Sequence, residues 1–372
     1  MRLMNETGKM IISENKLLKR GYTTGACATA ATKSAISALI KGEFIDPVTI
    51  VLPKGQRPSF DLAQQTMGNG WAKAGIIKDA GDDPDVTHGA LILAKISHAK
   101  PKSGISFSAG NGVGIVTKAG LPIKVGEAAI NPVPRQMMEN VINDFCAQEN
   151  IKADFNIEIS VANGEEIAKQ TLNSRLGILG GISILGTSGI VIPYSCSAWI
   201  SSIHSGIEVA LANENNHIVA STGDLSEKAA KSLLKLPDEA YIEMGDFVAG
   251  LLKYARKKTF KKITIAGGFA KITKLSQGAI DLHSKRSQVD FDSLASEIKD
   301  LGASDELVKQ AKIANSANQV LEFCQIAKIP LANSIAIKAH ITAKKTLKNN
   351  NIVLEVLIIN RKGEIIANSG GS

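Results

Sequence analysis

The sequence predicts a two-domain protein of mixed α+β and α/β class, with an N-terminal α+β layer domain in residues 1–195 and a C-terminal three-layer α/β domain in residues 196–372. Three observations support this. The chain has 372 residues, more than the roughly 250–300 at which a single hydrophobic core stops growing. Strand patterns follow one another in the first half, whereas strands and helices alternate after about residue 195. The composition, 44% hydrophobic and 21% charged, is typical of a globular protein.

In the first domain, a long helix is predicted from Thr24 to Ile40, because Ile36, Leu39 and Ile40 share one face and Gly42 ends the pattern. A second helix is predicted from Pro134 to Glu149, since proline favours the first helical turn. Runs rich in β-branched residues predict the remaining elements. These are strands within 48–53, 70–81 and 88–99, a strand, glycine turn and strand within 104–122, and a strand leading into a short helix within 155–164.

In the second domain, strand and helix patterns alternate, which predicts a parallel sheet with crossover helices. Strands are predicted within 217–222, 240–245 and 262–268, helices within 226–236 and 246–258, and a final helix before a hairpin at 352–369.

Several features exclude other classes of protein. Residues 176–203 carry no charge but contain five glycines and a proline, which predicts a buried glycine-rich connection and no membrane span. The four cysteines lie far apart and no signal-peptide pattern precedes them, as expected of a reduced, cytoplasmic protein. The net charge of +8 is spread along the chain, and the cluster 253–262 is interpreted as a solvated helix end, so no nucleic-acid partner is predicted. The sequence has no grouping of His and Cys residues of the kind that binds a metal ion, so no protein-held metal is predicted.

Two motifs in the first domain leave alternatives open. The segment "SAGNGVG" contains Gly110, Gly112 and Gly114, but the chain continues as strand, so it lacks the helix that a dinucleotide-binding loop requires. It is either a structural turn or a turn whose bare backbone approaches a ligand. The segment "KDAGDDPDVTHG" carries four aspartates, which are suited to a cation, a ribose diol or a tight turn.

Two further segments could bind an anion. The predicted strand 262–268 ends in two glycines and is followed by cationic side chains. This pattern is expected where a helix N-terminus binds a carboxylate or phosphate, and also in a solvated surface helix. The stretch "TTGAC", Thr23 to Cys27, begins the first helix and is a helix cap, an anion cradle or a nucleophile site.

Several segments together resemble the cobalt-precorrin-5B C1-methyltransferase (CbiD) family of the anaerobic cobalamin pathway. They are "RGYTTGACATAA", "VTIVLPKG", "KDAGDDPDVTHG", "GVGIVTKAGLP", "GEAAINPVPR", "RLGILGGISILGTSGIV" and "KITKLSQG". They follow the family's order from about residue 17 to the end of the chain. Any one would be a weak match, but seven in register are specific.

The resemblance implies S-adenosyl-L-methionine (SAM) as methyl donor, and a tetrapyrrole acceptor, cobalt-precorrin-5B, that is methylated at C1 to cobalt-precorrin-6A in cobalamin (vitamin B12) biosynthesis. It also implies a fold distinct from the usual tetrapyrrole methylases. Cobalt arrives already chelated in the substrate, so no protein metal site is expected. The electron-rich macrocycle makes a protein nucleophile unnecessary, which argues against Cys27, and no catalytic residue is assigned.

Under this resemblance, we expect two sets of binding residues. The donor set is Gly110, Asn111, Gly112 and Gly114, with Asp82 and Asp85 for the ribose or amino group. The substrate set is Thr23, Thr24 and Gly25, through free amides of the first helical turn, and Lys118, Arg135, Lys271, Lys274, His283 and Arg286 for the acetate and propionate arms. The alternatives are a small-molecule kinase with "TTGACATAA" as its phosphate loop, and a non-catalytic tetrapyrrole carrier. The sequence is also compatible with a homo-oligomer.

Overall fold

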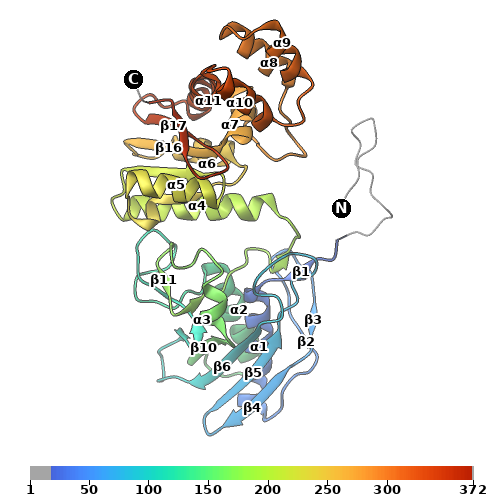
Figure 1. The fold of residues 1–372 in the computed structure, drawn as a ribbon. Helices are drawn as coiled ribbons and strands as arrows, with labels where there is room; N and C mark the ends of the chain where they lie inside the picture. The colour runs from blue at the N-terminus through green and yellow to red at the C-terminus, as the bar shows by residue number, and fades with distance from the viewer. Residues whose placement is uncertain (1–17, 371–372) are drawn as a thin grey trace. The chain divides into compact units, whose positions relative to one another are not determined.

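The computed structural model describes residues 18–370, which divide into two compact units (Figure 1). One unit holds the described chain up to Thr117 together with Pro122–Ser195. The other holds Lys118–Leu121 and the chain from Cys196 onward. The predicted fold class is confirmed, because the first unit is an α+β layer structure and the second has helices on both faces of a mostly parallel sheet.

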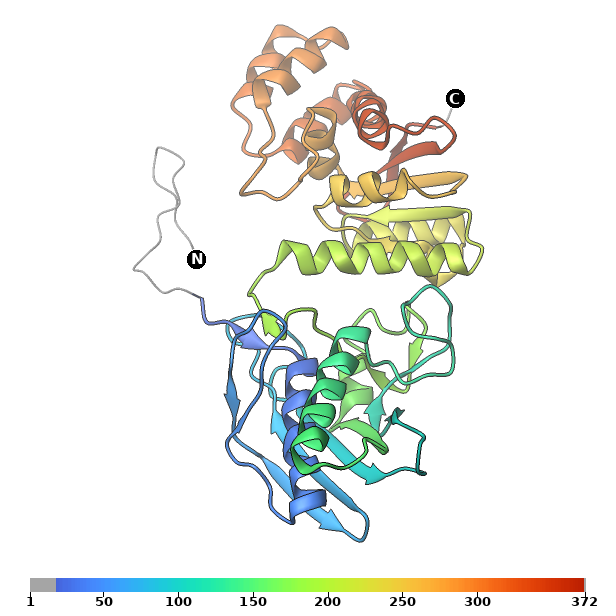
Figure 2. The ribbon, with the colours of Figure 1, turned by 180° about the vertical axis from the view of Figure 1, so that it is seen from behind.

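The first unit is built on a five-stranded sheet in the order β4-β5-β6-β10-β7. Its neighbours pair antiparallel except β10 and β7, which are parallel. Helices α1 and α2 lie side by side, with α1 against the sheet (Figures 1 and 2). The bounds are β4 Gln64–Gly68, β5 Trp71–Ile77, β6 Leu91–His98, β7 Ile105–Ala109, β10 Phe155–Val161, α1 Thr24–Lys41 and α2 Pro132–Glu149.

Local sequence explains these elements. Along β10, Phe155, Ile157, Ile159 and Val161 are buried while the residues between them are more exposed, the two-residue period of a strand with one face on the core. Helix α1 is rich in alanine and almost wholly buried, because small side chains let its backbone approach both the sheet and α2. It ends at Gly42, whose φ of 81° few other residues adopt readily.

The rest of the first unit consists of short strand pairs and one short helix. The pairs are β1 Gly21–Tyr22 with β13 Ile190–Val191, β2 Val48–Thr49 with β3 Ser59–Phe60, β8 Gly112–Val113 with β12 Gly181–Ile182, and β9 Ile115–Val116 with β11 Ile178–Leu179; the helix is α3 Gly164–Ala168. The predicted strand within 48–53 is only two residues long in the structure, although the chain stays beside its partner through hydrogen bonds from Ile50 N–H to the oxygen of Pro58 and from Leu52 N–H to the oxygen of Gln56.

The predicted strand, turn and strand within 104–122 do not form a hairpin. Strand β7 joins the main sheet beside β10, whereas β8 and β9 leave it and pair with β12 and β11. At the turn, Gly112 has a φ of 76°, and a Cβ atom there would lie 2.1 Å from the backbone oxygen of Val161. This conformation and close packing, which suit only glycine, direct the chain away from β7. The turn glycines thus redirect the chain between two pairings and do not reverse it.

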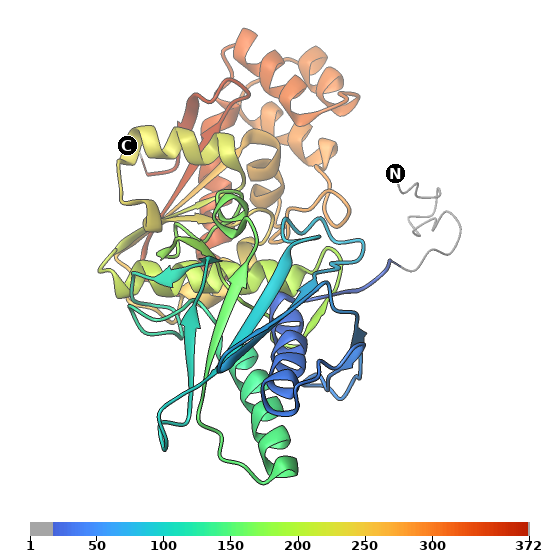
Figure 3. The same cartoon turned by 90° about the horizontal axis from the view of Figure 1, so that it is seen from below.

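The second unit has three layers (Figures 1 and 3). Its sheet has the order β15-β14-β16-β17-β18, with the first four strands parallel and β18 antiparallel. Helix α5 covers one face, and α4, α6, α7 and α11 cover the other. The bounds are β14 His217–Ser221, β15 Tyr241–Glu243, β16 Lys262–Gly268, β17 Val353–Ile359, β18 Ile365–Asn368, α4 Cys196–Ala212, α5 Asp224–Leu234, α6 Val248–Ala255, α7 Phe269–Ser276 and α11 Leu331–Leu347.

The central strands are buried on both faces, as their nearly continuous apolar sequences require. In β17, Val356 and Ile358 pack into the cluster under α6, α7 and α11, while Leu357 and Ile359 pack under α5. The alternation expected after residue 195 is therefore realised as a parallel sheet whose two faces are both covered.

Some elements of this half were not predicted. They are α4, a short 3₁₀ turn Asp238–Ala240, α8 Phe291–Asp300, α9 Asp305–Lys312 and α10 Ala317–Ile326. The expectation of a buried connection over 176–203 is wrong in part, because α4 begins at Cys196 and Leu179, Ile192 and Tyr194 are 52%, 53% and 69% exposed. Within residues 18–370, none of the helices is both long enough and apolar enough to cross a bilayer.

Candidate functional site

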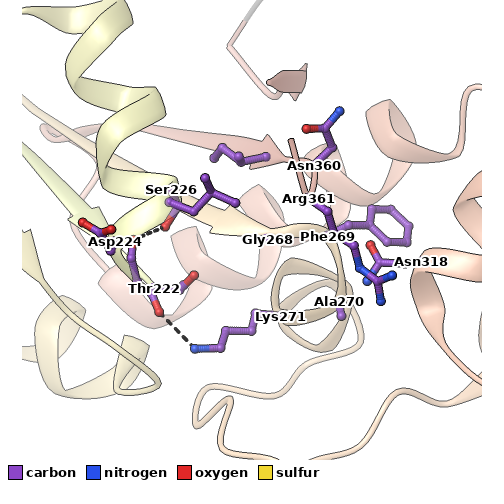
Figure 4. Close-up of a pocket in the computed structure, with 13 residues that line it drawn as sticks. Thr222, Asp224, Ser226, Gly268, Phe269, Ala270, Lys271, Asn318, Asn360 and Arg361 are labelled. Carbon is purple, nitrogen blue, oxygen red and sulfur yellow. Dashed lines mark hydrogen bonds between the residues drawn. The ribbon is translucent and has the colours of Figure 1, made fainter. Parts of the chain in front are cut away.

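The carboxyl ends of β14, β16 and β17 border a cavity of about 310 Å³ in the second unit (Figure 4). From β14 the chain passes through α5 to β15 on one side, and then through α6 to β16 on the other side of β14. This is a point of reversed strand order, where open α/β sheets bind their ligands. The lining residues are Thr222, Gly223, Asp224, Leu225, Ser226, Gly268, Phe269, Ala270, Lys271, Asn318, Ile359, Asn360 and Arg361.

Two helices begin at this cavity. Helix α5 starts after Gly223 and α7 after Gly268, and neither has a side-chain cap. By contrast, α8, α9 and α10 are capped by Asp290, Ser304 and Ser316. The first amide N–H groups of an α-helix have no acceptor within the helix, so the two first turns line the cavity with unsatisfied donors and positive helix-dipole ends.

Three side chains add to this donor character. Thr222 is 7% exposed, and its hydroxyl has no hydrogen bond to any of the described residues. Asn318 and Arg361 also line the cavity, and their side chains have no partner within residues 18–370. Because hydroxyl, amide and guanidinium groups converge with two helix N-termini, the cavity is suited to a carboxylate or another small anion.

Lys271, which the sequence assigned to an anion, lies in the wall of this cavity (Figure 4). Its Nζ donates to the backbone oxygen of Thr222 at 3.0 Å and lies 3.0 Å from Asp246 Oδ1. These contacts fix the ammonium group beside the end of β14. Lys271 thus contributes a positioned positive charge, part of which Asp246 already balances.

The other predicted substrate cations of the second unit are engaged within the protein. Lys274 Nζ donates to the backbone oxygen of Leu282 at 3.0 Å, and Arg286 pairs with Asp281 and donates to Cys196 Sγ. His283 Nδ1 accepts a hydrogen bond from the backbone N–H of Lys285. None of these three is among the residues lining the cavity.

Lys118 and Arg135 are engaged as well. Lys118 Nζ lies 2.7 Å from Glu239, and this hydrogen bond holds the pKa of the Glu239 carboxyl below its usual value. In the first unit, Arg135 donates to the backbone oxygens of Ile130 and Ala128 and pairs with Glu127 at 2.9 Å. A substrate role for these cations stays a prediction, and it requires an exchange of partners.

The glycines predicted to approach the donor are packed against their own chain. A Cβ atom at Gly110 would lie 2.1 Å from Ser160 Oγ, and one at Gly112 would lie 2.1 Å from the backbone oxygen of Val161. At Gly114, the same atom would lie 2.4 Å from Ile178. Close packing accounts for all three glycines, so their donor role stays a prediction. Asn111 beside them is exposed.

The aspartate cluster fastens the loop that it occupies. Asp82 accepts from the backbone N–H of Lys19 at 2.6 Å, and Asp83 accepts from the backbone N–H of Tyr194 at 2.8 Å. Asp85 accepts from Lys78 Nζ at 2.6 Å and from Thr87. The turn interpretation explains these carboxylates, and a donor role for Asp82 and Asp85 stays a prediction.

The opening stretch of α1 is a helix cap. Thr23 Oγ1 accepts from the N–H of Ala26, and the N–H of Gly25 donates to the backbone oxygen of Leu185 at 3.0 Å. Thr24 is 3% exposed and its hydroxyl donates to the same oxygen. The expectation of free amides here is wrong, because the segment around Leu185 supplies the acceptors. Burial raises the pKa of the Cys27 thiol to about 12, so Cys27 is no thiolate nucleophile.

Thr222, Asn318 and Arg361 were not predicted from the sequence as site residues. A threonine and a glycine directly after the strand 217–221 could have indicated Thr222. Asn318 belongs to α10 and Arg361 to the β17–β18 turn, both far along the chain, and only tertiary packing brings them to Thr222. Within residues 18–370, no group of three or more His, Cys, Asp and Glu side chains is arranged to hold a metal ion.

The fold and the cavity define a mixed α/β protein with a cavity at the carboxyl edge of the sheet in its second unit. Residues 11–193 match the CbiD family model, and residues 281–370 match the model of the CbiD C-terminal domain. A Brucella anthropi protein named cobalt-precorrin-5B C(1)-methyltransferase is 54% identical to this chain, and the alignment covers 98% of this chain and 99% of that protein. A Brucella canis protein of the same name is 55% identical, with 95% of this chain and 96% of that protein covered. The chain therefore belongs to the CbiD family.

The cobalamin biosynthesis protein (cbiD) from Archaeoglobus fulgidus, known from a crystal structure, is 29% identical in sequence to this chain. The alignment covers 74% of this chain and 86% of that one, with a TM-score of 0.40.

Proposed function

We propose that this chain transfers a methyl group from SAM to C1 of cobalt-precorrin-5B, giving cobalt-precorrin-6A in anaerobic cobalamin biosynthesis. The observation that carries the proposal is the 54% identity, over 98% of the chain, to a relative named for this methyl transfer. SAM is the co-substrate, and cobalt enters only as part of the tetrapyrrole. We place the reaction in the cytoplasm because all four cysteines are free thiols, as a reducing compartment keeps them.

The chemistry asks the protein mainly for positioning. The bond from sulfur to the methyl carbon breaks with its electron pair going to sulfur, and the macrocycle supplies the pair that forms the new bond at C1. Orientation of two reactants contributes about 7–11 kcal/mol to catalysis in favourable cases. No protein nucleophile is required, which agrees with a Cys27 thiol that is buried and protonated at neutral pH.

The tetrapyrrole carries several carboxylate arms, and we propose that cationic side chains bind them. The proposed residues are Lys118, Arg135, Lys271, Lys274, His283 and Arg286. Lys271 offers a positioned positive charge, since its Nζ donates to the backbone oxygen of Thr222. Arg135 and Arg286 offer bidentate geometry for a carboxylate if they release their present partners.

For the donor, the sequence proposes the loop of Gly110, Asn111, Gly112 and Gly114 with Asp82 and Asp85. Packing weakens that proposal, because the three glycines are closed by their own chain and both carboxylates hold backbone N–H or lysine groups. Thr23, Thr24 and Gly25 are weakened as substrate residues for a similar reason.

The reaction is tested with purified full-length chain, cobalt-precorrin-5B and SAM carrying an isotopically labelled methyl group. We expect a product one labelled methyl heavier than the substrate, formed together with an equal amount of S-adenosylhomocysteine (SAH). A chain that binds the tetrapyrrole without forming this product would be a carrier. A chain whose melting temperature rises with ATP and not with SAM would favour the kinase, since only a ligand of the native state stabilises it.

A further inference from the structure

We propose that the cavity at the ends of β14, β16 and β17 binds the methyl donor, with the donor's carboxylate held by the N-termini of α5 and α7 together with Thr222 and Arg361. This inference rests on the proposed function, because it takes SAM as the co-substrate. It assigns the donor to the second unit, away from the glycine loop that the sequence indicates.

Two glycines at the cavity, Gly223 and Gly268, have no structural reason within the described chain. Most described glycines have a structural reason, either a left-handed φ or a neighbouring atom that a Cβ would meet. Gly223 and Gly268 have neither, because their φ angles are 163° and −66° and a Cβ atom at either would meet nothing within 4 Å. Among the glycines of residues 18–370, only these two lack both a left-handed φ and a neighbouring atom within 4 Å of an added Cβ. A ligand that touches the backbone there would explain both.

The cavity wall offers hydrogen-bond donors and positive charge to a carboxylate. Thr222 is more than nine-tenths buried, and its hydroxyl has no partner among the described residues (Figure 4). Two uncapped helix N-termini and the unpartnered guanidinium of Arg361 surround the same space. Because this hydroxyl has no partner among the described residues and faces the cavity, it is available to a bound acceptor. Both the donor and the tetrapyrrole carry carboxylates, so this chemistry alone does not distinguish them.

An acidic residue on the neighbouring strand distinguishes the methyl donor from the tetrapyrrole. In nucleoside-binding α/β sheets, an acidic residue about 20 positions after the first glycine turn lies at the end of the next strand and binds the ribose hydroxyls. Here Glu243 follows Gly223 by about that spacing. It ends β15, in register with Ser221 at the end of β14. Its carboxylate has no hydrogen bond or ion pair within the described chain. Glu243 does not line the cavity itself, but it ends the strand next to β14. An acid for a ribose on the strand beside a carboxylate cradle fits an adenosyl amino acid better than a macrocycle.

The test compares SAH with 5′-methylthioadenosine, which has the same nucleoside and thioether but no amino-acid carboxylate. Calorimetry on the full-length chain measures both affinities. We expect Arg361→Gln and Thr222→Val each to weaken SAH by about ten- to hundred-fold, the range for hydrogen bonds to a charged group, and to leave methylthioadenosine unchanged. Glu243→Gln should weaken both ligands. Lys362→Gln is the matched control, an exposed neighbouring cation that does not line the cavity, and should change neither.

A fourth variant blocks the cavity without a clash. Because a Cβ at Gly268 meets nothing within 4 Å and its φ suits any residue, Gly268→Val should keep the wild-type melting temperature and lose both ligands. If all these variants bind SAH as the wild type does, the inference is overturned, whereas labelled product from the wild type would still support the proposed function. Weaker tetrapyrrole binding with unchanged SAH binding would also overturn it, because the cavity would then hold the acceptor. If the wild type binds SAH but forms no methylated product, the proposed function fails and the site assignment stands.

Discussion

Lys78 Nζ lies 2.6 Å from Asp85 Oδ2, and the lysine side chain is 1% exposed, so a buried ammonium directly after β5 depends on one carboxylate of the aspartate cluster. Asp85 also accepts two hydrogen bonds from Thr87, which hold the carboxylate in place. The most buried member of a cluster that the sequence offered to a ligand is thus committed to the fold.

Replacing Asp85 should destabilise the protein. Asp85→Asn leaves the Lys78 ammonium buried without its counter-ion, a change that costs about 3–5 kcal/mol in comparable buried pairs. Denaturant unfolding measures the loss. Asp82→Asn is the matched control, since Asp82 is exposed and holds only the backbone N–H of Lys19. We expect SAH affinity to be unchanged in both variants, and a loss in the stably folded Asp82 variant would return this cluster to the donor site.

The same pair predicts an acid dependence. Burial acts to raise the pKa of Asp85, but the Lys78 ammonium and the Thr87 hydrogen bonds outweigh it and bring the pKa below its ordinary value of 3.8. A carboxyl with a lowered pKa in the folded state stabilises the protein above the unfolded pKa, and this contribution is lost as the pH falls below about 3.8. Melting temperatures from pH 6 to pH 3 should therefore fall more steeply for the wild type than for Asp85→Asn. Parallel curves would contradict the assignment.

Gly25→Val should affect folding more than ligand binding. A Cβ at Gly25 would lie 2.6 Å from Pro134 Cγ, so α1 and α2 would have to separate, and overpacking of this kind costs about 1–3 kcal/mol. The free energy of unfolding and the SAH affinity, measured on the folded fraction, separate the two effects. A variant with wild-type stability and weak ligand binding would restore the anion-cradle interpretation of this stretch.

The Gly110–Gly114 loop can be tested without disturbing it. Gly112→Ala should lower stability by more than about 1 kcal/mol, because a φ of 76° and a contact of 2.1 Å to Val161 both oppose a side chain. Asn111→Ala removes an exposed side chain with no hydrogen bond within the described residues and should be neutral for folding. If Asn111→Ala weakens SAH binding, the donor lies at this loop and not at the Thr222 cavity.

We propose that the two compact units are separate domains with a boundary after Ser195. Ile192 and Tyr194 are 53% and 69% exposed directly before α4 begins at Cys196, so limited proteolysis should cut there first. Mass spectrometry should find two resistant fragments that meet near residue 195. Early cuts inside β10 or β16 would argue against the boundary.

The parts of the fold that the sequence predicted are those with a local cause. The cap at Thr23, the end of α1 at Gly42 and the two-residue period of β10 each follow from residues close in sequence. Strands and a turn within 104–122 were predicted, but not their partners, because β8 and β9 pair more than 60 residues away, with a segment that has no strand pattern of its own. Two-residue strands carry too few side chains to reveal their register.

The sequence by itself determined the family, the fold class and the kinds of residue available, through seven segments in order and the alternation of strands and helices. Only the tertiary structure decided which of those residues share a site. It placed Thr222, Gly268, Asn318 and Arg361 around one cavity because strand order, and not chain distance, sets which loops meet at a sheet edge. In the tertiary structure, the polar groups of Thr23, Asp85 and Arg135 form hydrogen bonds within the protein, because a donor, acceptor or charge that packing buries needs a partner.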